Sequence, residues 1–328
     1  MKIIAIAIKL RSAILNKMQP AGSNLLRTLV LLPLAAFFAT ATQAQPSVIT
    51  LTPAFVLAGS PELIRVSAPA NASVAGSWQG HTLQFFRGRA VAFHGKTSSA
   101  SAWYALAGVD VESPVGPSSL KISIRHDNTS RELTRTIAIH PAHYQTGSIT
   151  VEPKFVEPGP EEKEKIEAAS KAKEKAFAAA AESTGIDRPL WSGNFVAPVP
   201  AQSTDSFGKR RIYNGKLASI HKGTDFRASP GTPVHAGNAG IVILAQPLYY
   251  EGNCVMIDHG FGLISISMHL SRIDVKPGQE VTRGQLIGLS GATGRVTGPH
   301  LHWAIRWQGA MLDPMKLLRM NLNKIDNN

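Results

Sequence analysis

The sequence predicts a mainly β protein with an N-terminal immunoglobulin-like β-sandwich, a helical spacer and a second β-rich domain at its C-terminal end. Three observations support this fold class. Short runs of alternating apolar and polar residues fill the chain from Pro46 to about Tyr144, a charged and alanine-rich stretch follows, and short apolar runs broken by glycine and proline continue from Trp191. Alternation with a period of two is typical of half-buried strands.

The sandwich is expected within residues 45–150. Its strand-like runs recur at spacings that suit a sandwich of about seven strands. The clearest of these runs are Leu63 to Val66, Leu83 to Phe86, Ala90 to Phe93, Lys121 to Arg125 and Thr136 to Ile139.

Residues 151–190 are predicted to be a linker that contains a charged helix from Glu161 to Glu182. Pro160 suits the first turn of a helix, and Gly185 suits its end. The large apolar residues of this stretch are too sparse for a coiled-coil seam. We therefore expect a solvated helix that acts as a spacer.

The first 44 residues are predicted to be a secretory signal peptide. Five basic residues precede an apolar run from Leu29 to Ala41, and Thr42-Gln43-Ala44 follows as a cleavage site of small residues. The apolar run is shorter than the ~20 residues of a membrane-spanning helix, so a retained anchor is the alternative. No later stretch is apolar enough to span a membrane. We expect an exported protein that is periplasmic or associated with the cell envelope.

Charge and cysteine content limit the classes of function. Removing residues 1–44 leaves 29 basic and 22 acidic residues, a net charge of +7. Nucleic acid, anionic lipid and acidic wall polymers would all attract such a surface. Nucleic acid is the least favoured partner, because no motif combines basic with aromatic residues and export conflicts with it. The single cysteine, Cys254, excludes an internal disulfide and lies in an apolar stretch typical of a buried strand.

Residues 191–328 contain two pairs of side chains that suit a metal site. His221 and Asp225 are four residues apart and share a face in a helix or a strand, whereas His300 and His302 share a face only in a strand. Two histidines and one aspartate match the ligand set of a catalytic zinc site, which keeps a fourth position for water. Spacing alone does not distinguish His300 from His302 as the ligand.

The stretch from Trp191 to Leu318 resembles the LytM/lysostaphin-type zinc endopeptidases of peptidoglycan, which implies a β-rich domain like a duplicated hybrid motif. Several blocks in the family's order carry this resemblance. They are Ser206-Phe207-Gly208-Lys209-Arg210-Arg211, His221-Lys222-Gly223-Thr224-Asp225, Gly231-Thr232-Pro233-Val234, Ile257-Asp258-His259-Gly260, Met268-His269-Leu270, and the run from Thr293 through His300-Leu301-His302 to Trp303.

The resemblance implies that His221, Asp225 and His302 bind one zinc ion and that His269 and His300 are catalytic. It further implies hydrolysis of the peptide cross-links of bacterial peptidoglycan, with wall stem peptides as the substrate. A contact from the N-terminal domain that restrains the activity is a further expectation. The alternative is a non-catalytic wall-binding protein that activates another hydrolase, but all five motif residues are present, which favours the enzyme. The motifs do not fix which cross-link is cut.

Four neighbouring residues are interpreted with these motifs. Ser267 stands where the family usually has tyrosine, which puts local packing in question. His259 is expected to hydrogen-bond the backbone rather than to bind metal. Arg210 and Arg211 either contact a substrate carboxylate or form a solvated basic turn.

Overall fold

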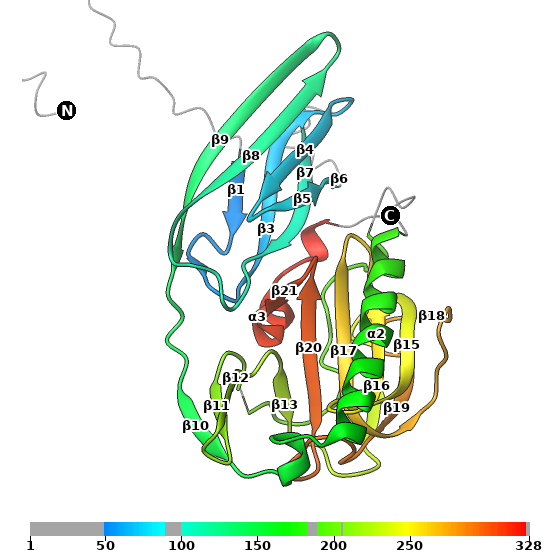
Figure 1. Cartoon of the computed structure of the whole chain (residues 1–328). Coiled ribbons are helices and arrows are strands. Elements are labelled where there is room, and N and C mark those ends of the chain that lie inside the picture. The colour runs from blue at the N-terminus through cyan, green and yellow to red at the C-terminus, as the bar shows by residue number, and fades with distance from the viewer. Residues whose placement is uncertain (1–48, 89–99, 183–188, 205, 326–328) are drawn as a thin grey trace, which may run out of the picture. The chain divides into compact units, whose positions relative to one another are not determined.

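The structure is a computed structural model that describes residues 49–88, 100–182, 189–204 and 206–325 (Figure 1). The predicted signal peptide, the run from Ala90 to Phe93 and Gly185 lie outside these ranges. Within the described ranges, no helix is both long and apolar enough to cross a membrane.

The N-terminal part of the chain forms two β-sheets whose buried side chains belong to one hydrophobic cluster. The alternation read from the sequence appears directly in β8, where Leu120, Ile122 and Ile124 are buried and their neighbours are more exposed. One sheet has the order β1 (Ile49–Thr52), β3 (Pro61–Pro69), β7 (Ala100–Gly108), β6 (Phe86–Arg87), and the other β2 (Val56–Leu57), β9 (Thr129–His140), β8 (Gly116–His126), β4 (Ser73–Trp78), β5 (His81–Gln84). The immunoglobulin-like assignment stays a prediction.

A nine-stranded sheet forms the centre of the C-terminal part. Its middle strands are buried along almost their whole length, with apolar residues such as Val255, Ile257, Leu301 and Ile305 in the core. The main order is β13 (Thr224–Phe226), β20 (Leu301–Trp307), β17 (Leu263–Ile273), β16 (Gly252–Asp258), β15 (Gly240–Leu248), β18 (Glu280–Val281), with β14 (Pro233–His235), β19 (Leu286–Ser290) and β21 (Ala310–Leu312) paired beside it. The predicted mainly β fold class is confirmed.

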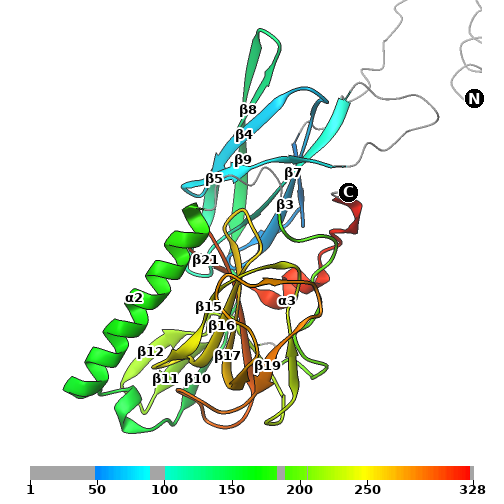
Figure 2. The same cartoon turned by 90° about the vertical axis from the view of Figure 1, so that its right-hand side faces the viewer.

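Helix α2 (Pro160–Glu182) packs along this sheet, beside β15 (Figure 2). Its buried contacts come from alanines: Ala169, Ala176 and Ala180 pack in one cluster with strand residues such as Met256. At the same time, several of its charged side chains are exposed to solvent. The helix is therefore charged as predicted, but it is not a fully solvated spacer.

The chain between the sandwich and α2 also joins the C-terminal part. Strand β10 (Thr146–Ile149) pairs in parallel with β11 (Arg210–Tyr213), which pairs with β12 (Leu217–Ile220). A short 3₁₀ helix, η1 (Pro153–Phe155), follows, and its Phe155 packs against Tyr213.

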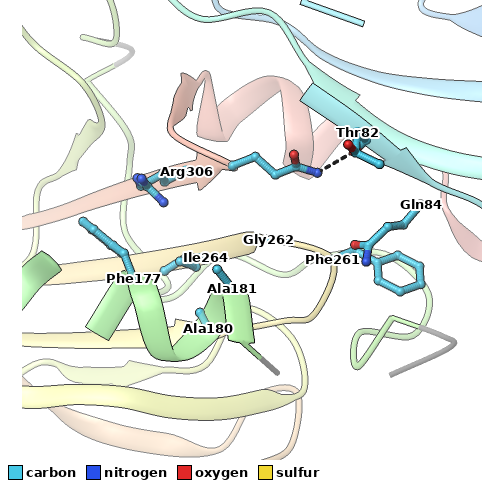
Figure 3. Close-up of a pocket in the computed structure, with 10 residues that line it drawn as sticks. Thr82, Gln84, Phe177, Ala180, Ala181, Phe261, Gly262, Ile264 and Arg306 are labelled. Atoms are coloured by element: carbon cyan, nitrogen blue, oxygen red, sulfur yellow. Dashed lines mark hydrogen bonds between the residues drawn. The ribbon is translucent and has the colours of Figure 1, made fainter. Parts of the chain in front are cut away.

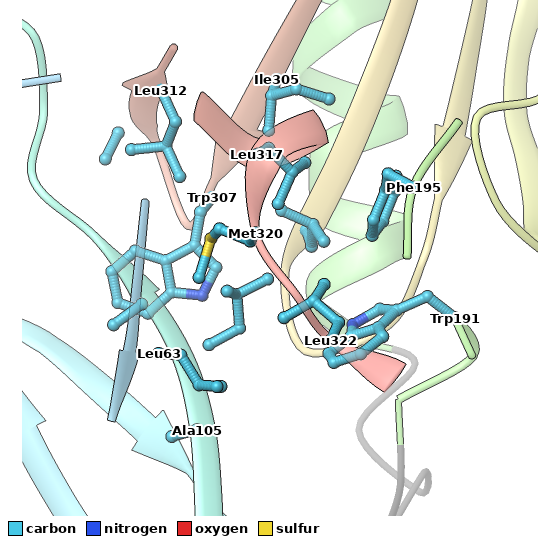
Figure 4. Close-up of a cluster of buried hydrophobic side chains, with 14 of the residues drawn as sticks. Leu63, Ala105, Trp191, Phe195, Ile305, Trp307, Leu312, Leu317, Met320 and Leu322 are labelled. Atoms are coloured by element: carbon cyan, nitrogen blue, oxygen red, sulfur yellow. The ribbon is translucent and has the colours of Figure 1, made fainter. Parts of the chain in front are cut away.

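Buried side chains connect the sandwich with the C-terminal part. Leu63 and Ala105 lie in the same cluster as Trp307 and Leu312 (Figure 4). The approach is close, because a Cβ placed on Gly108 of β7 would lie 2.3 Å from a methyl carbon of Leu312. The two parts therefore share a core. The short C-terminal helix α3 (Pro314–Arg319) also contributes to this core.

Candidate metal centre

The strand register brings the predicted ligands together. Strands β13 and β20 are antiparallel, and Asp225 lies opposite His302. His221 precedes β13, and its Nε2 atom lies 3.1 Å from Asp225 Oδ1 and 2.9 Å from His302 Nδ1. His302 Nδ1 is 2.9 Å from Asp225 Oδ1. Three candidate ligand atoms thus converge on one point.

Two features of the backbone hold this arrangement. His221 Nδ1 donates a hydrogen bond to the Ser206 carbonyl oxygen at 2.9 Å, which leaves the Nε2 lone pair facing the centre. Gly223 provides space for the ring of His302, since a Cβ at this position would lie 2.4 Å from His302 Nε2. The glycine between the histidine and the aspartate is therefore required sterically.

The chemistry of these residues fits a zinc ion. Burial lowers the pKa of His221 to about 4, so its imidazole is neutral and able to bind a metal at pH 7. Burial alone would raise the pKa of Asp225, but the imidazoles of His221 and His302 beside its carboxylate hold the pKa well below its usual value. Two imidazole nitrogens and one carboxylate oxygen about 3 Å apart suit an ion with bonds of ~2.0–2.2 Å.

Arg211 supports the carboxylate from behind. Its Nη2 atom donates to Asp225 Oδ2 at 2.7 Å, while Oδ1 of the same carboxylate faces the histidines. The sequence left Arg211 either as a substrate contact or as a solvated turn. The structure shows a third role, because this mostly buried guanidinium orients a candidate metal ligand.

His269 and His300 lie side by side next to the candidate ligands. Their ring centroids are 4.9 Å apart, and the rings of His269 and His302 are 6.0 Å apart. His269 Nδ1 donates to the Thr293 carbonyl and His300 Nδ1 to the Gly298 carbonyl, each at 2.8 Å. Both histidines therefore keep a free lone pair on Nε2, and His300 Nε2 lies 3.6 Å from Asp225 Oδ1.

The surroundings of His269 keep it neutral and fix its position. Burial, with the neighbouring His302 and His300, lowers the pKa of His269 to about 3. Its backbone has a φ of +64°, and its N–H donates to the Glu251 carbonyl at 2.9 Å. A non-glycine residue in this conformation costs on the order of 1–3 kcal/mol, and such residues are frequent at active sites.

Two hollows open beside this cluster. One of about 270 Å³ is lined by residues that include Asp225, His269 and His300, and one of about 480 Å³ by residues that include His221 and His302. A further hollow of about 480 Å³ lies between α2, β5 and the C-terminal sheet, where Arg306 stacks on Phe177 (Figure 3). None of the five motif residues lines this hollow, so it is separate from the candidate centre.

The neighbouring residues of the motifs have structural contacts. His259 is buried, donates to the Ala239 carbonyl at 2.7 Å and lies 2.8 Å from the Ser265 hydroxyl, as expected for a residue that does not bind metal. Ser267 is buried in β17 opposite Trp303. Tyr213 and Tyr250 border the hollow beside His269 and His302, although no sequence motif contains them.

Comparison with known proteins identifies the domain. The family model described as Peptidase family M23 matches residues 219–314, which contain all five motif residues. The chain carries a peptidase family M23 domain. The family prediction is thereby confirmed.

Curated relatives support this domain assignment. The chain is 46% identical over 114 residues to the peptidoglycan DD-endopeptidase ShyA of Vibrio cholerae, a match that covers 34% of this chain and 26% of the relative. It is 39% identical over 98 residues to the DD-carboxypeptidase/endopeptidase Mpg of Neisseria meningitidis, covering 30% of this chain and 23% of the relative. The chain thus spans about a quarter of the length of these relatives.

One solved structure extends the similarity beyond the M23 domain. A crystal structure from Pseudomonas aeruginosa, described as a candidate peptidase M23, superposes with a TM-score of 0.53 and 27% sequence identity. The match covers 77% of this chain and 92% of that chain. The fold that the two chains share is therefore larger than the 96 residues from 219 to 314.

Proposed function

We propose that this protein is a zinc-dependent endopeptidase that hydrolyses the peptide cross-links of bacterial peptidoglycan after export to the periplasm or cell envelope. The observation that carries the proposal is the convergence of two imidazoles and a carboxylate beside a second pair of histidines, His269 and His300. The names of the curated relatives, which are peptidoglycan DD-endopeptidases, support the choice of substrate. The predicted export peptide supports the location.

In this proposal His221, Asp225 and His302 hold one zinc ion, while His269 and His300 move protons. Zinc would polarise the scissile carbonyl and lower the pKa of water to ~7. The Nε2 lone pairs of His269 and His300 can accept a proton from the attacking water and pass it to the leaving amine. Once protonated, either imidazole can donate a hydrogen bond to the oxyanion of the tetrahedral intermediate.

Replacement of single histidines tests these roles. His302→Ala should lose bound zinc, measured by metal analysis after dialysis, and release no muropeptides from purified peptidoglycan. His300→Ala should keep zinc and lose hydrolysis. His126→Ala, in the sandwich, is the control and should keep both zinc and activity. Full activity of His300→Ala would refute the assigned roles.

The alternative function is a non-catalytic activator of another wall hydrolase. It predicts that the zinc-loaded protein releases fragments only when a second hydrolase is added. The complete set of five motif residues favours the enzyme.

We also propose that the N-terminal part restrains the peptidase by narrowing its cleft. Glu112, which follows β7, lines the hollow that contains His221 and forms a salt bridge of 2.6 Å with Lys222. Val151, which follows β10 at the start of the linker, lines the hollow that contains His269. Glu112→Ala should therefore raise the rate of peptidoglycan digestion, and an unchanged rate would count against the restraint.

A further inference from the structure

Arg295 lies in the loop before β20 and contacts two aromatic rings. Its guanidinium carbon is 4.6 Å from the ring centroid of Tyr213 and 4.5 Å from that of Tyr250. Its backbone N–H donates to the Tyr250 carbonyl at 2.9 Å, which also fixes the loop. These cation–π contacts hold the guanidinium against the rings without using its N–H donors.

The position of Arg295 connects it with the candidate active site. It lines the hollow that contains Asp225, His269 and His300, and it also lines the hollow that contains His221. A substrate that places its scissile amide beside the histidines would therefore have a neighbouring group next to Arg295.

The charges around these two hollows are otherwise paired. The described acidic residues of their lining are Asp225, Glu112 and Glu251, which form salt bridges with Arg211, Lys222 and Lys173. No carboxylate of the described residues forms a salt bridge with Arg295. Among the described lining residues with a permanent positive charge, Arg295 is thus the one left for a ligand.

We propose that Arg295 binds a free carboxylate of the substrate, within one residue of the scissile amide. The guanidinium presents parallel N–H donors that match the two oxygens of a carboxylate, and the tyrosine rings hold it in place before the substrate arrives. This inference rests on the proposed function and narrows its substrate class. Cross-links with a carboxylate beside the cut, such as a diaminopimelate-containing bridge, are good substrates, and an uncharged glycine bridge is a poor one.

A pair of synthetic cross-linked peptides tests this assignment. The two peptides share one sequence and differ only in a free carboxylate or a carboxamide next to the scissile amide. For the zinc-loaded wild-type protein, kcat/KM should be about tenfold to a hundredfold higher for the carboxylate peptide, the range expected for hydrogen bonds between charged groups. In Arg295→Gln this ratio should fall to about 1.

Two further variants keep the result interpretable. Arg295→Lys keeps the positive charge but lacks the parallel N–H donors of the guanidinium, so its ratio of kcat/KM values for the two peptides should be intermediate. This variant also tests the inference if Arg295→Gln does not fold. Arg283→Gln removes an exposed arginine in another loop and should keep the wild-type ratio. The inference would be overturned if Arg295→Gln lowered kcat/KM equally for both peptides. It would also be overturned if the wild-type protein itself cut the two peptides with equal kcat/KM.

Binding measurements separate this inference from the proposed enzymatic function. If the wild-type protein cuts neither peptide, the proposed function fails, and the dissociation constants of the two peptides are compared instead. Tighter binding of the carboxylate peptide that disappears in Arg295→Gln would uphold the role of Arg295 in recognition. Equal binding of both peptides to the wild-type protein would overturn it.

Discussion

Replacing Gly223 with alanine should disrupt the metal centre through a single methyl group. A Cβ at Gly223 would lie 2.4 Å from His302 Nε2, whereas ordinary contacts begin at 3.4 Å, so the ring must retreat by about 1 Å. The backbone of the neighbouring strand clashes as well, because the Trp303 carbonyl oxygen would lie only 2.7 Å from the same Cβ. Metal ligands are held within ~0.2 Å of their ideal distances, so a displacement of this size moves His302 out of position.

We expect the zinc affinity of Gly223→Ala to fall by about 10-fold to 100-fold or more, as for other changes that disturb a ligand's orientation. The assay is a zinc titration against a competing chelator, followed by peptidoglycan digestion at saturating zinc. Gly159→Ala is the matched control, because its Cβ would meet only the end of the flexible Glu162 side chain. Wild-type zinc affinity and activity in Gly223→Ala would refute the steric argument.

Three other predictions concern Asp225, the sandwich and helix α2. Arg211→Met leaves Asp225 Oδ2 without its partner and should weaken zinc binding about 10-fold to 100-fold in the same titration. Burial raises the pKa of Glu62 to about 8, so wild-type stability falls as pH rises from about 4.5 to 8. Glu62→Gln should therefore become more stable than wild type across that window, by on the order of 4 kcal/mol at pH 8, measured by denaturant unfolding. The same difference in free energy of unfolding between the two proteins at pH 5 and at pH 8 would contradict the raised pKa. Ala176→Glu buries a charge under α2 and should lower the melting temperature, while the exposed Ala178→Glu should not.

The centre could be predicted because its residues carry local geometric information. Histidines two residues apart share a face only in a strand, and the extended segment that runs from His300 into β20 places both His300 and His302 beside Asp225. Only the family resemblance distinguished their roles. The structure adds that His302 directs Nδ1 to the cluster, whereas His300 uses Nδ1 to bind the Gly298 carbonyl.

Contacts between distant segments could not be predicted from sequence patterns. Helix α2 packs through alanines, and a search for large apolar residues overlooks such a face. Arg295 stacks on Tyr213 and Tyr250, which are 82 and 45 residues away in the chain, so no local pattern connects them. Arg211 lay in a recognised motif, but its contact with Asp225 depends on where β11 and β13 lie in the fold.

The most direct test of the central claim is digestion of purified peptidoglycan by the chain that begins at Gln45, with and without a chelator, followed by mass analysis of the fragments. The account predicts new peptide termini that disappear with the chelator and return when zinc is added. If the zinc-loaded protein releases no fragments, and the isolated segment from Trp191 onward also releases none, the proposed endopeptidase is contradicted and the activator is favoured.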